Sequence, residues 1–97
     1  MDLGSFKATL QEAEPPGEAG PLLQALWWDA QGDWDRAHRL AQAQPGADGA
    51  WVHAYLHRVE GDAGNARYWY SRAGRPLSGA PLADEWDEIA AALLDGA

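Results

Sequence analysis

The sequence predicts an all-α fold, a short right-handed stack of antiparallel helical hairpins with five to six helices. Its main segments are rich in Ala, Leu, Gln and Arg, which favour helix, and breaks containing Gly and Pro separate them. Strand signals are missing, because apolar and polar residues do not alternate. The β-branched residues are few: Thr9, Val52, Val59 and Ile89. The 97 residues are therefore expected to form one helical domain.

The helices follow one another between clear turn signals. A short helix near residues 5–12 precedes the loop EPPGEAGP, whose last residue, Pro21, suits the first position of the next helix. The remaining helices are expected at 21–31, 33–43, 49–60, 62–73 and 82–94. The breaks QPGADG and GRPLSGAP separate the third helix from the fourth and the fifth from the last.

Two tight turns repeat along the chain and join the predicted helices into hairpins. AQGDWDRA (30–37) and VEGDAGNA (59–66) share Gly-Asp, followed by Ala four residues after the Asp. The glycine supplies a left-handed residue at the end of one helix, and Asp33 or Asp62 caps the next helix. Because the turns lie 29 residues apart, the chain contains a repeated hairpin of the kind that stacks. The single domain then has three parts: an N-terminal segment (1–20), two helical hairpins (21–76) and a capping helix (77–97).

The segment AYLHRVEGDAGNARYWYSRA resembles a tetratricopeptide-type repeat, nearest to its Sel-like branch. Its second helix carries small, aromatic and small residues where that family has them, at Ala66, Tyr70 and Ala73. The unit at 22–43 departs from the pattern with Ala41 in place of an aromatic residue, and Pro45 and Pro76 shorten the period. The resemblance implies a tetratricopeptide-like stack that serves as a scaffold for varied partners. Residues 48–76 also resemble a group of short, uncharacterised bacterial proteins.

Charge and composition narrow the choice of partner. The net charge of −8 argues against nucleic acid and anionic membranes as partners. Acidic residues dominate 1–35 and 76–97, whereas 36–75 holds six Arg against three acids. This centre could bind an anion or an acidic peptide, or it could pair with the acidic ends. Without a signal-peptide-like start or a membrane-length apolar run, the chain is expected to be cytoplasmic, while the absence of cysteine leaves the redox compartment open.

Helical periodicity, at about 100° per residue, separates inward-facing from outward-facing side chains. The residues expected to face inward are Leu22, Leu23, Leu26, Ala30, Trp51, Val52, Tyr55, Leu56, Val59, Ala63, Ala66, Trp69, Tyr70, Ala73, Leu82, Trp86, Ile89, Ala90 and Leu93. Tyr68 points outward from its helix. Trp28 also points away from its stripe, so either the N-terminal segment covers it with Phe6 and Leu10 or a second molecule does.

The reverse face of the fourth predicted helix carries His53, His57 and Glu60. We expect this face to border a polar groove or solvent, because the first helix of a stacked hairpin commonly lines the concave surface. Histidines at i and i+4 could bind a metal, yet HAYLH lacks the second-position glutamate of a zinc-hydrolase helix. No metal is predicted.

No catalytic machinery is evident in the sequence, and no enzyme is predicted. The hydroxyl nucleophiles Ser5, Thr9, Ser71 and Ser78 do not occur in a nucleophile-elbow context. Acid pairs such as Asp84 and Glu85 are expected at helix N-termini, where the helix dipole favours negative charge.

The favoured function is a protein- or peptide-interaction module without a cofactor, and a subunit of a homodimer with no further ligand is a third interpretation. The alternative is a small-ligand- or metal-binding protein, conceivably an enzyme, that uses His53, His57 and nearby arginines. Arg72 could grip a carboxylate or phosphate with two hydrogen bonds, beside the ring and hydroxyl of Tyr68. The candidate binding surface joins two adjacent helices and consists of His53, His57, Arg58, Asn65, Tyr68 and Arg72.

Overall fold

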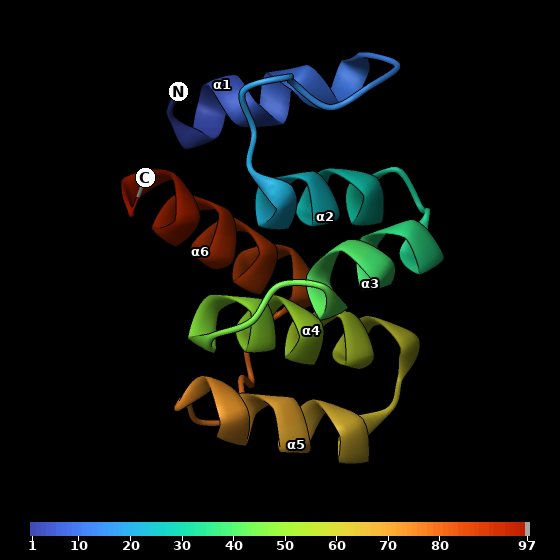
Figure 1. Cartoon of the computed structure of the whole chain (residues 1–97), viewed down its shortest axis with the longest axis vertical. Coiled ribbons are helices and arrows are strands. Elements are labelled where there is room, and N and C mark those ends of the chain that lie inside the picture. The colour runs from blue at the N-terminus through green and yellow to red at the C-terminus, as the bar shows by residue number, and fades with distance from the viewer. Residues whose placement is uncertain (97) are drawn as a thin grey trace.

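A computed structural model describes residues 1–96 and is helical throughout, with no strand in that range (Figure 1). Its elements are α1 (Leu3–Ala8), the 3-10 turn η1 (Thr9–Gln11), α2 (Pro21–Ala30), α3 (Trp34–Gln42), α4 (Ala47–Glu60), α5 (Ala63–Ala73) and α6 (Leu82–Asp95). The all-α prediction is confirmed, and the helix ends differ from prediction by a residue or two. The first helix differs more, because it divides into α1 and η1. Residue 97, the last of the predicted capping segment, lies outside the described part.

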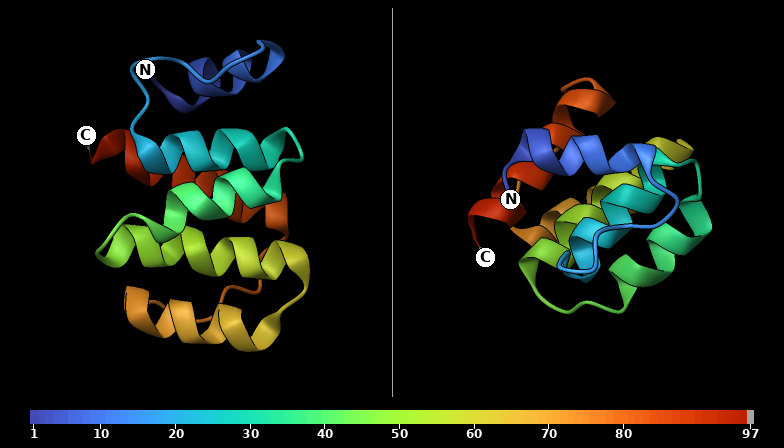
Figure 2. Two further views of the ribbon diagram at one scale, coloured as in Figure 1. Left: turned by 45° about the vertical axis from the view of Figure 1, so that its right-hand side comes forward. Right: turned by 90° about the horizontal axis from the view of Figure 1, so that it is seen from above.

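The helices are layered along the longest axis of the molecule (Figure 1). α1 and α5 lie at opposite ends, with the α2–α3 hairpin and α4 between them. α4 pairs with α5 in the second hairpin, and α6 packs across α1, α2 and α4 (Figure 2). α4 is therefore the central helix, with α2, α3, α5 and α6 as neighbours. None of the helices within residues 1–96 combines the length and apolar character needed to span a bilayer.

The two hairpin turns are built alike, as their sequences predict. Gly32 and Gly61 both have a φ angle of +86°, a left-handed conformation that glycine adopts without a steric penalty. Asp33 and Asp62 follow them, and each side chain accepts a hydrogen bond from a backbone N–H three residues on, at 3.1 Å in both turns. The local sequence thus determines where each hairpin folds back.

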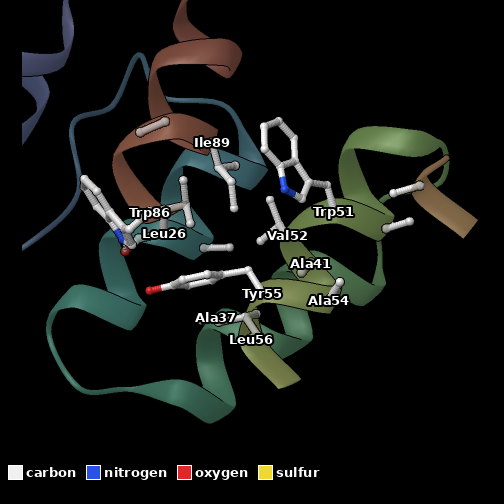
Figure 3. Packing of buried hydrophobic residues seen from close by; sticks show 14 of the residues in the cluster. Leu26, Ala37, Ala41, Trp51, Val52, Ala54, Tyr55, Leu56, Trp86 and Ile89 are labelled. Carbon is white, nitrogen blue, oxygen red and sulfur yellow. Dashed lines mark hydrogen bonds between the residues drawn. The ribbon is translucent and has the colours of Figure 1, made fainter. Parts of the chain in front are cut away.

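The core is centred on α4, which is buried from Gly49 to His57 (Figure 3). Leu26 of α2 and Ile89 of α6 are fully buried with it. On the α3 side, the small residues Ala37 and Ala41 are also fully or almost fully buried. Small side chains in this position let two helices approach closely, and close packing maximises dispersion contacts.

Some residues predicted to face inward are not buried. Ala30, Ala63 and Leu82 are exposed, and Leu82 retains 39% of its accessible surface. Each of them is the first or last residue of its helix, where neighbouring helices cover less of the side chain. Trp69 is only partly buried and packs against the core from outside, whereas Tyr70 is buried as predicted.

The N-terminal segment folds back as one prediction required, and its buried aromatic residue packs on α6. Phe6 is fully buried and stacks on Trp86, with ring centroids 5.8 Å apart. The indole N–H of Trp27 donates to a backbone carbonyl of η1 at 3.2 Å. Trp28 lies under the guanidinium of Arg36, 4.0 Å from its ring centroid, which is a cation–π contact. A neighbour on α3 therefore covers Trp28.

A buried carboxylate ties α6 to the second hairpin. Glu85 lies in the first turn of α6, as predicted, yet only 1% of its surface is exposed. It accepts hydrogen bonds from the Trp51 indole at 3.2 Å, the Tyr70 hydroxyl at 2.7 Å and the Arg58 guanidinium. Arg58 also donates to the Ala80 carbonyl at 2.7 Å. Burial and the contact with Glu85 raise the pKa of the Tyr70 hydroxyl, which therefore remains a donor.

We expect Glu85→Ala to lower the free energy of unfolding by about 3 kcal/mol, because Arg58 loses its counter-charge inside the protein. Urea unfolding followed by tryptophan fluorescence measures this loss. Glu88→Ala changes an exposed residue of the same helix and is expected to alter stability by less than about 0.5 kcal/mol. If Glu85→Ala lowers the free energy of unfolding no more than Glu88→Ala does, the buried ion pair does not stabilise the fold.

Candidate metal centre

All three histidines of the chain meet between α3 and α4. His38 lies on α3, while His53 and His57 lie one turn apart on α4. One ring nitrogen of each histidine falls within 4.8 Å of the corresponding nitrogens of the other two. The Nε2 atoms of His38 and His53 are 2.9 Å apart. We refer to His38, His53 and His57 as the histidine cluster.

Tryptophan rings enclose the histidine cluster. Trp69 of α5 stacks on His53, with ring centroids 4.0 Å apart and planes within 15°. Trp34 of α3 stacks on His38 at 4.7 Å and 12°, and its indole N–H donates to a backbone carbonyl of α4 at 2.7 Å. Only 6% of His53 and 7% of His57 remain exposed. The imidazoles are thus held in fixed positions with little access to water.

The prediction that His53 and His57 border solvent or a polar groove holds only in part: both side chains are buried, and His53 alone lines a cavity. The prediction assumed that neighbouring helices cover only one face of α4. Because α4 is the central helix, α3 and α5 also cover its second face and bring Trp34, His38 and Trp69 onto the imidazoles. The histidines therefore contact each other and aromatic rings.

The surroundings of His38 and His53 favour neutral imidazoles. Burial is the main cause that lowers the pKa of His53 to about 4, and His38 and His57 lower it further. The pKa of His38 is also lowered, mainly by burial and then by His57, although Glu60 and Asp35 act in the opposite direction. A neutral imidazole carries a lone pair on one nitrogen, and this is the form that binds metal ions.

Hydrogen bonds orient the rings within the cluster. His57 Nδ1 lies 2.6 Å from Glu60 Oε1, so the ring donates its Nδ1–H to this carboxylate. Whenever His57 is neutral, its lone pair is then on the remaining nitrogen, Nε2. In the hydrogen bond between the Nε2 atoms of His38 and His53, one ring donates its N–H and the other ring accepts it. Transfer of that proton to the other nitrogen of its ring would give both residues a free Nε2.

The ligand set fits a zinc-like ion. Tetrahedral zinc holds imidazole nitrogens at about 2.0–2.1 Å, which places two ligand nitrogens about 3.3 Å from each other. The Nε2 atoms of His38 and His53 would have to separate only slightly from their present 2.9 Å, and the His57 nitrogen, which lies within 4.8 Å of the other two, would have to reach the same spacing. Imidazole ligands suit zinc, copper, nickel and iron, and three of them leave a coordination position open.

A second group of possible ligands, His57, Glu60 and Asp62, is less suitable. Both oxygens of Asp62 are already engaged by Asn65, one by its backbone N–H at 3.1 Å and one by its side-chain amide at 2.7 Å. These bonds cap α5, so a metal here would disrupt the turn between α4 and α5. The histidine cluster is the better candidate.

The predicted binding surface is divided in the structure. His53 and Arg72 line one cavity of about 340 Å³ with Trp69 between the end of α3, the start of α4 and α5. Tyr68 is 51% exposed, and its hydroxyl oxygen accepts a hydrogen bond from Arg72 at 3.3 Å. The structure thus brings together His53, His57, Tyr68 and Arg72.

Two predicted binding residues have other contacts. Arg58 pairs with the buried Glu85 on the side of α4 that faces α6, and Asn65 is bonded to the capping Asp62. Neither lines the cavity that contains His53 and Arg72. Their side chains stabilise the fold instead of extending the predicted surface.

His38 is the member of the cluster that sequence reasoning missed. It lies one turn after Trp34 on the second helix of the first hairpin. In a stack of hairpins this helix packs against the first helix of the next unit, which carries the other two histidines. That neighbour relation, together with the count of only three histidines, is the signal that could have identified it.

Comparison of the chain with protein-family models, with curated proteins and with solved structures found no match. The resemblance to tetratricopeptide and Sel-like repeats therefore stays a prediction. The histidine cluster has to be interpreted from its own geometry and chemistry.

In metal-free solution, we expect the protein to lose stability as the pH falls from about 6.5 to about 4. An unfolded histidine has a pKa near 6.5, whereas the pKa of His53 in the folded protein is about 4. As the pH falls, the unfolded chain therefore binds a proton before the folded protein does. Above pH 6.5 the neutral His53 costs no stability, and below it the free energy of unfolding falls by up to about 1.4 kcal/mol per pH unit within this window. Urea unfolding at several pH values measures the slope. His53→Gln should flatten it, and an unchanged slope would contradict a buried, neutral His53.

Proposed function

We propose that the protein binds a divalent transition-metal ion, with zinc as the expected ion, through His38, His53 and His57. The observation that carries this proposal is the convergence of all three histidines of the chain at one buried point. Borderline-soft divalent ions prefer imidazole nitrogen over the oxygen ligands that calcium and magnesium require. The histidine cluster offers three imidazole nitrogens as ligands and contains no oxygen ligand.

The protonation state of the cluster supports metal binding at neutral pH. Protons compete with metal ions for imidazole lone pairs, and burial weakens that competition by lowering the pKa values of His38 and His53. Glu60 adds a second supporting feature, because a carboxylate bonded to the far nitrogen of a ligand histidine orients the ring and raises its basicity.

A bound metal would join the two hairpins, since His38 belongs to the first and His53 and His57 belong to the second. An ion that binds the folded state and not the unfolded chain stabilises the fold by mass action. The open coordination position would hold water, and zinc lowers the pKa of such a water to about 7. Two expectations from the sequence stay predictions. One is that the protein is not an enzyme, and the other is that it has a protein or peptide partner.

Metal-free protein is expected to bind one zinc ion per chain, measured by isothermal titration calorimetry. Zinc at a hundred times its dissociation constant should add about 2.7 kcal/mol to the free energy of unfolding. For a domain of this size, that gain corresponds to a rise of about 10 °C or more in the melting temperature. Magnesium, which prefers oxygen ligands, should produce no such rise.

Matched variants decide whether the histidines are the ligands. His38→Gln changes a half-buried member of the cluster and should abolish the zinc-dependent rise in melting temperature. Arg39→Gln changes its exposed neighbour on α3 and should leave the rise intact. A folded His38→Gln protein that binds zinc as tightly as the wild type would contradict the proposal.

The contact between Glu60 and His57 makes a separate prediction. Glu60→Gln keeps an acceptor for the Nδ1–H of His57 but removes the negative charge, so zinc affinity should fall by about 10–100-fold. Competition with a chromogenic chelator measures the affinity. Asp35→Asn removes an exposed acid of α3 that has no bond to an imidazole, and it should have little effect. An equal loss of zinc affinity in both variants would show that net charge, and not the contact with His57, determines the affinity.

A further inference from the structure

The cavity that contains Arg72 shares one residue with the histidine cluster. His53 belongs to both, and Trp69, which stacks on His53, forms part of the cavity wall. The volume of about 340 Å³ is within the range of small-molecule sites. A molecule in this cavity would therefore contact a residue that we propose as a metal ligand.

Arg72 supplies the charge in this cavity. Its guanidinium carbon lies 5.8 Å from the ring centroids of both Tyr68 and Trp69. Among residues 1–96, the arginine ion pairs involve Arg36 and Arg58, so Arg72 has no carboxylate partner there. The two aromatic rings and the Tyr68 hydroxyl hold the guanidinium without neutralising its charge.

The rest of the wall is largely uncharged. It includes the apolar side chains of Pro45, Ala47 and Ala50 and the Trp69 ring, together with the uncharged polar residues Gln42 and Gln44. A ligand that satisfies this wall carries one anionic group for Arg72 and an apolar face for Trp69, and polar substituents on it can bond to the glutamines. The net charge of −8 on the whole chain disfavours anions with several charges.

We propose that this cavity binds a small organic monocarboxylate next to the metal site. The inference rests on the proposed metal binding, because the open coordination position of the ion and the Arg72 guanidinium would be the two positive groups that recognise the carboxylate. The apolar part of the ligand packs on Trp69 and the alanines of α4. This arrangement brings Arg72 and His53 of the predicted surface together in one cavity, with Tyr68 bonded to Arg72 outside the cavity wall.

Cobalt-loaded protein and benzoate test the proposal. Cobalt(II) takes the place of zinc, and its visible absorption changes when an anion enters its coordination sphere. We expect benzoate to change this spectrum in a saturable manner. Arg72→Gln should keep the spectrum of the benzoate-free cobalt protein and weaken benzoate binding at least tenfold, as expected for loss of a charge-assisted hydrogen bond.

Arg67→Gln is the matched control, because Arg67 is an exposed arginine of α5 outside the cavity wall. It should bind benzoate as the wild type does. Equal weakening in both variants, or no response of the cobalt spectrum to benzoate, would overturn the carboxylate proposal while the metal proposal stands. Inorganic phosphate that competes as strongly as benzoate would overturn the choice of an organic monocarboxylate.

Failure of the underlying metal proposal gives a different result. The chain would then bind no cobalt. Calorimetric titration of the metal-free protein with benzoate tests whether the cavity binds a carboxylate without a metal. Binding that depends on Arg72 would retain the carboxylate site without a metal. Absence of binding would overturn both proposals.

Discussion

The enclosure of α4 is the constraint on which the rest of the structure depends. Four helices surround it, so the side chains along most of its length lie out of contact with water. An amphipathic helix with one covered face can direct its polar residues to solvent, but a central helix cannot. Every buried polar side chain on α4 must therefore find a partner within the protein.

The polar groups of α4 meet this requirement in two different ways. Arg58, on the side facing α6, forms an ion pair with Glu85, whose oxygens also accept hydrogen bonds from Trp51 and Tyr70. This network is complete without any ligand, so we regard it as structural. On the sides facing α3 and α5, the histidine cluster is held by stacking and by Glu60, and the lowered pKa values of His38 and His53 favour the neutral form, whose lone pair a metal can use.

The repeated hairpin explains why the histidines come from both units. Stacking places the second helix of one hairpin against the first helix of the next, which is the contact between α3 and α4. Ligands contributed from both sides of this contact would link metal binding to the docking of the hairpins. The same contact ends near the cavity lined by Trp69 and Arg72, so the proposed ligand site lies beside a structural junction.

The sequence by itself determined the helices, their order and the two Gly-Asp turns, because capping and left-handed glycine depend on residues a few positions apart. It also identified His53, His57 and Arg72 as residues of interest. Only the tertiary structure decided that His38 joins the cluster, that Glu85 is buried and that Trp28 lies under an arginine. These contacts depend on which helices become neighbours, and helical periodicity describes each helix alone, without the neighbours that cover its second face.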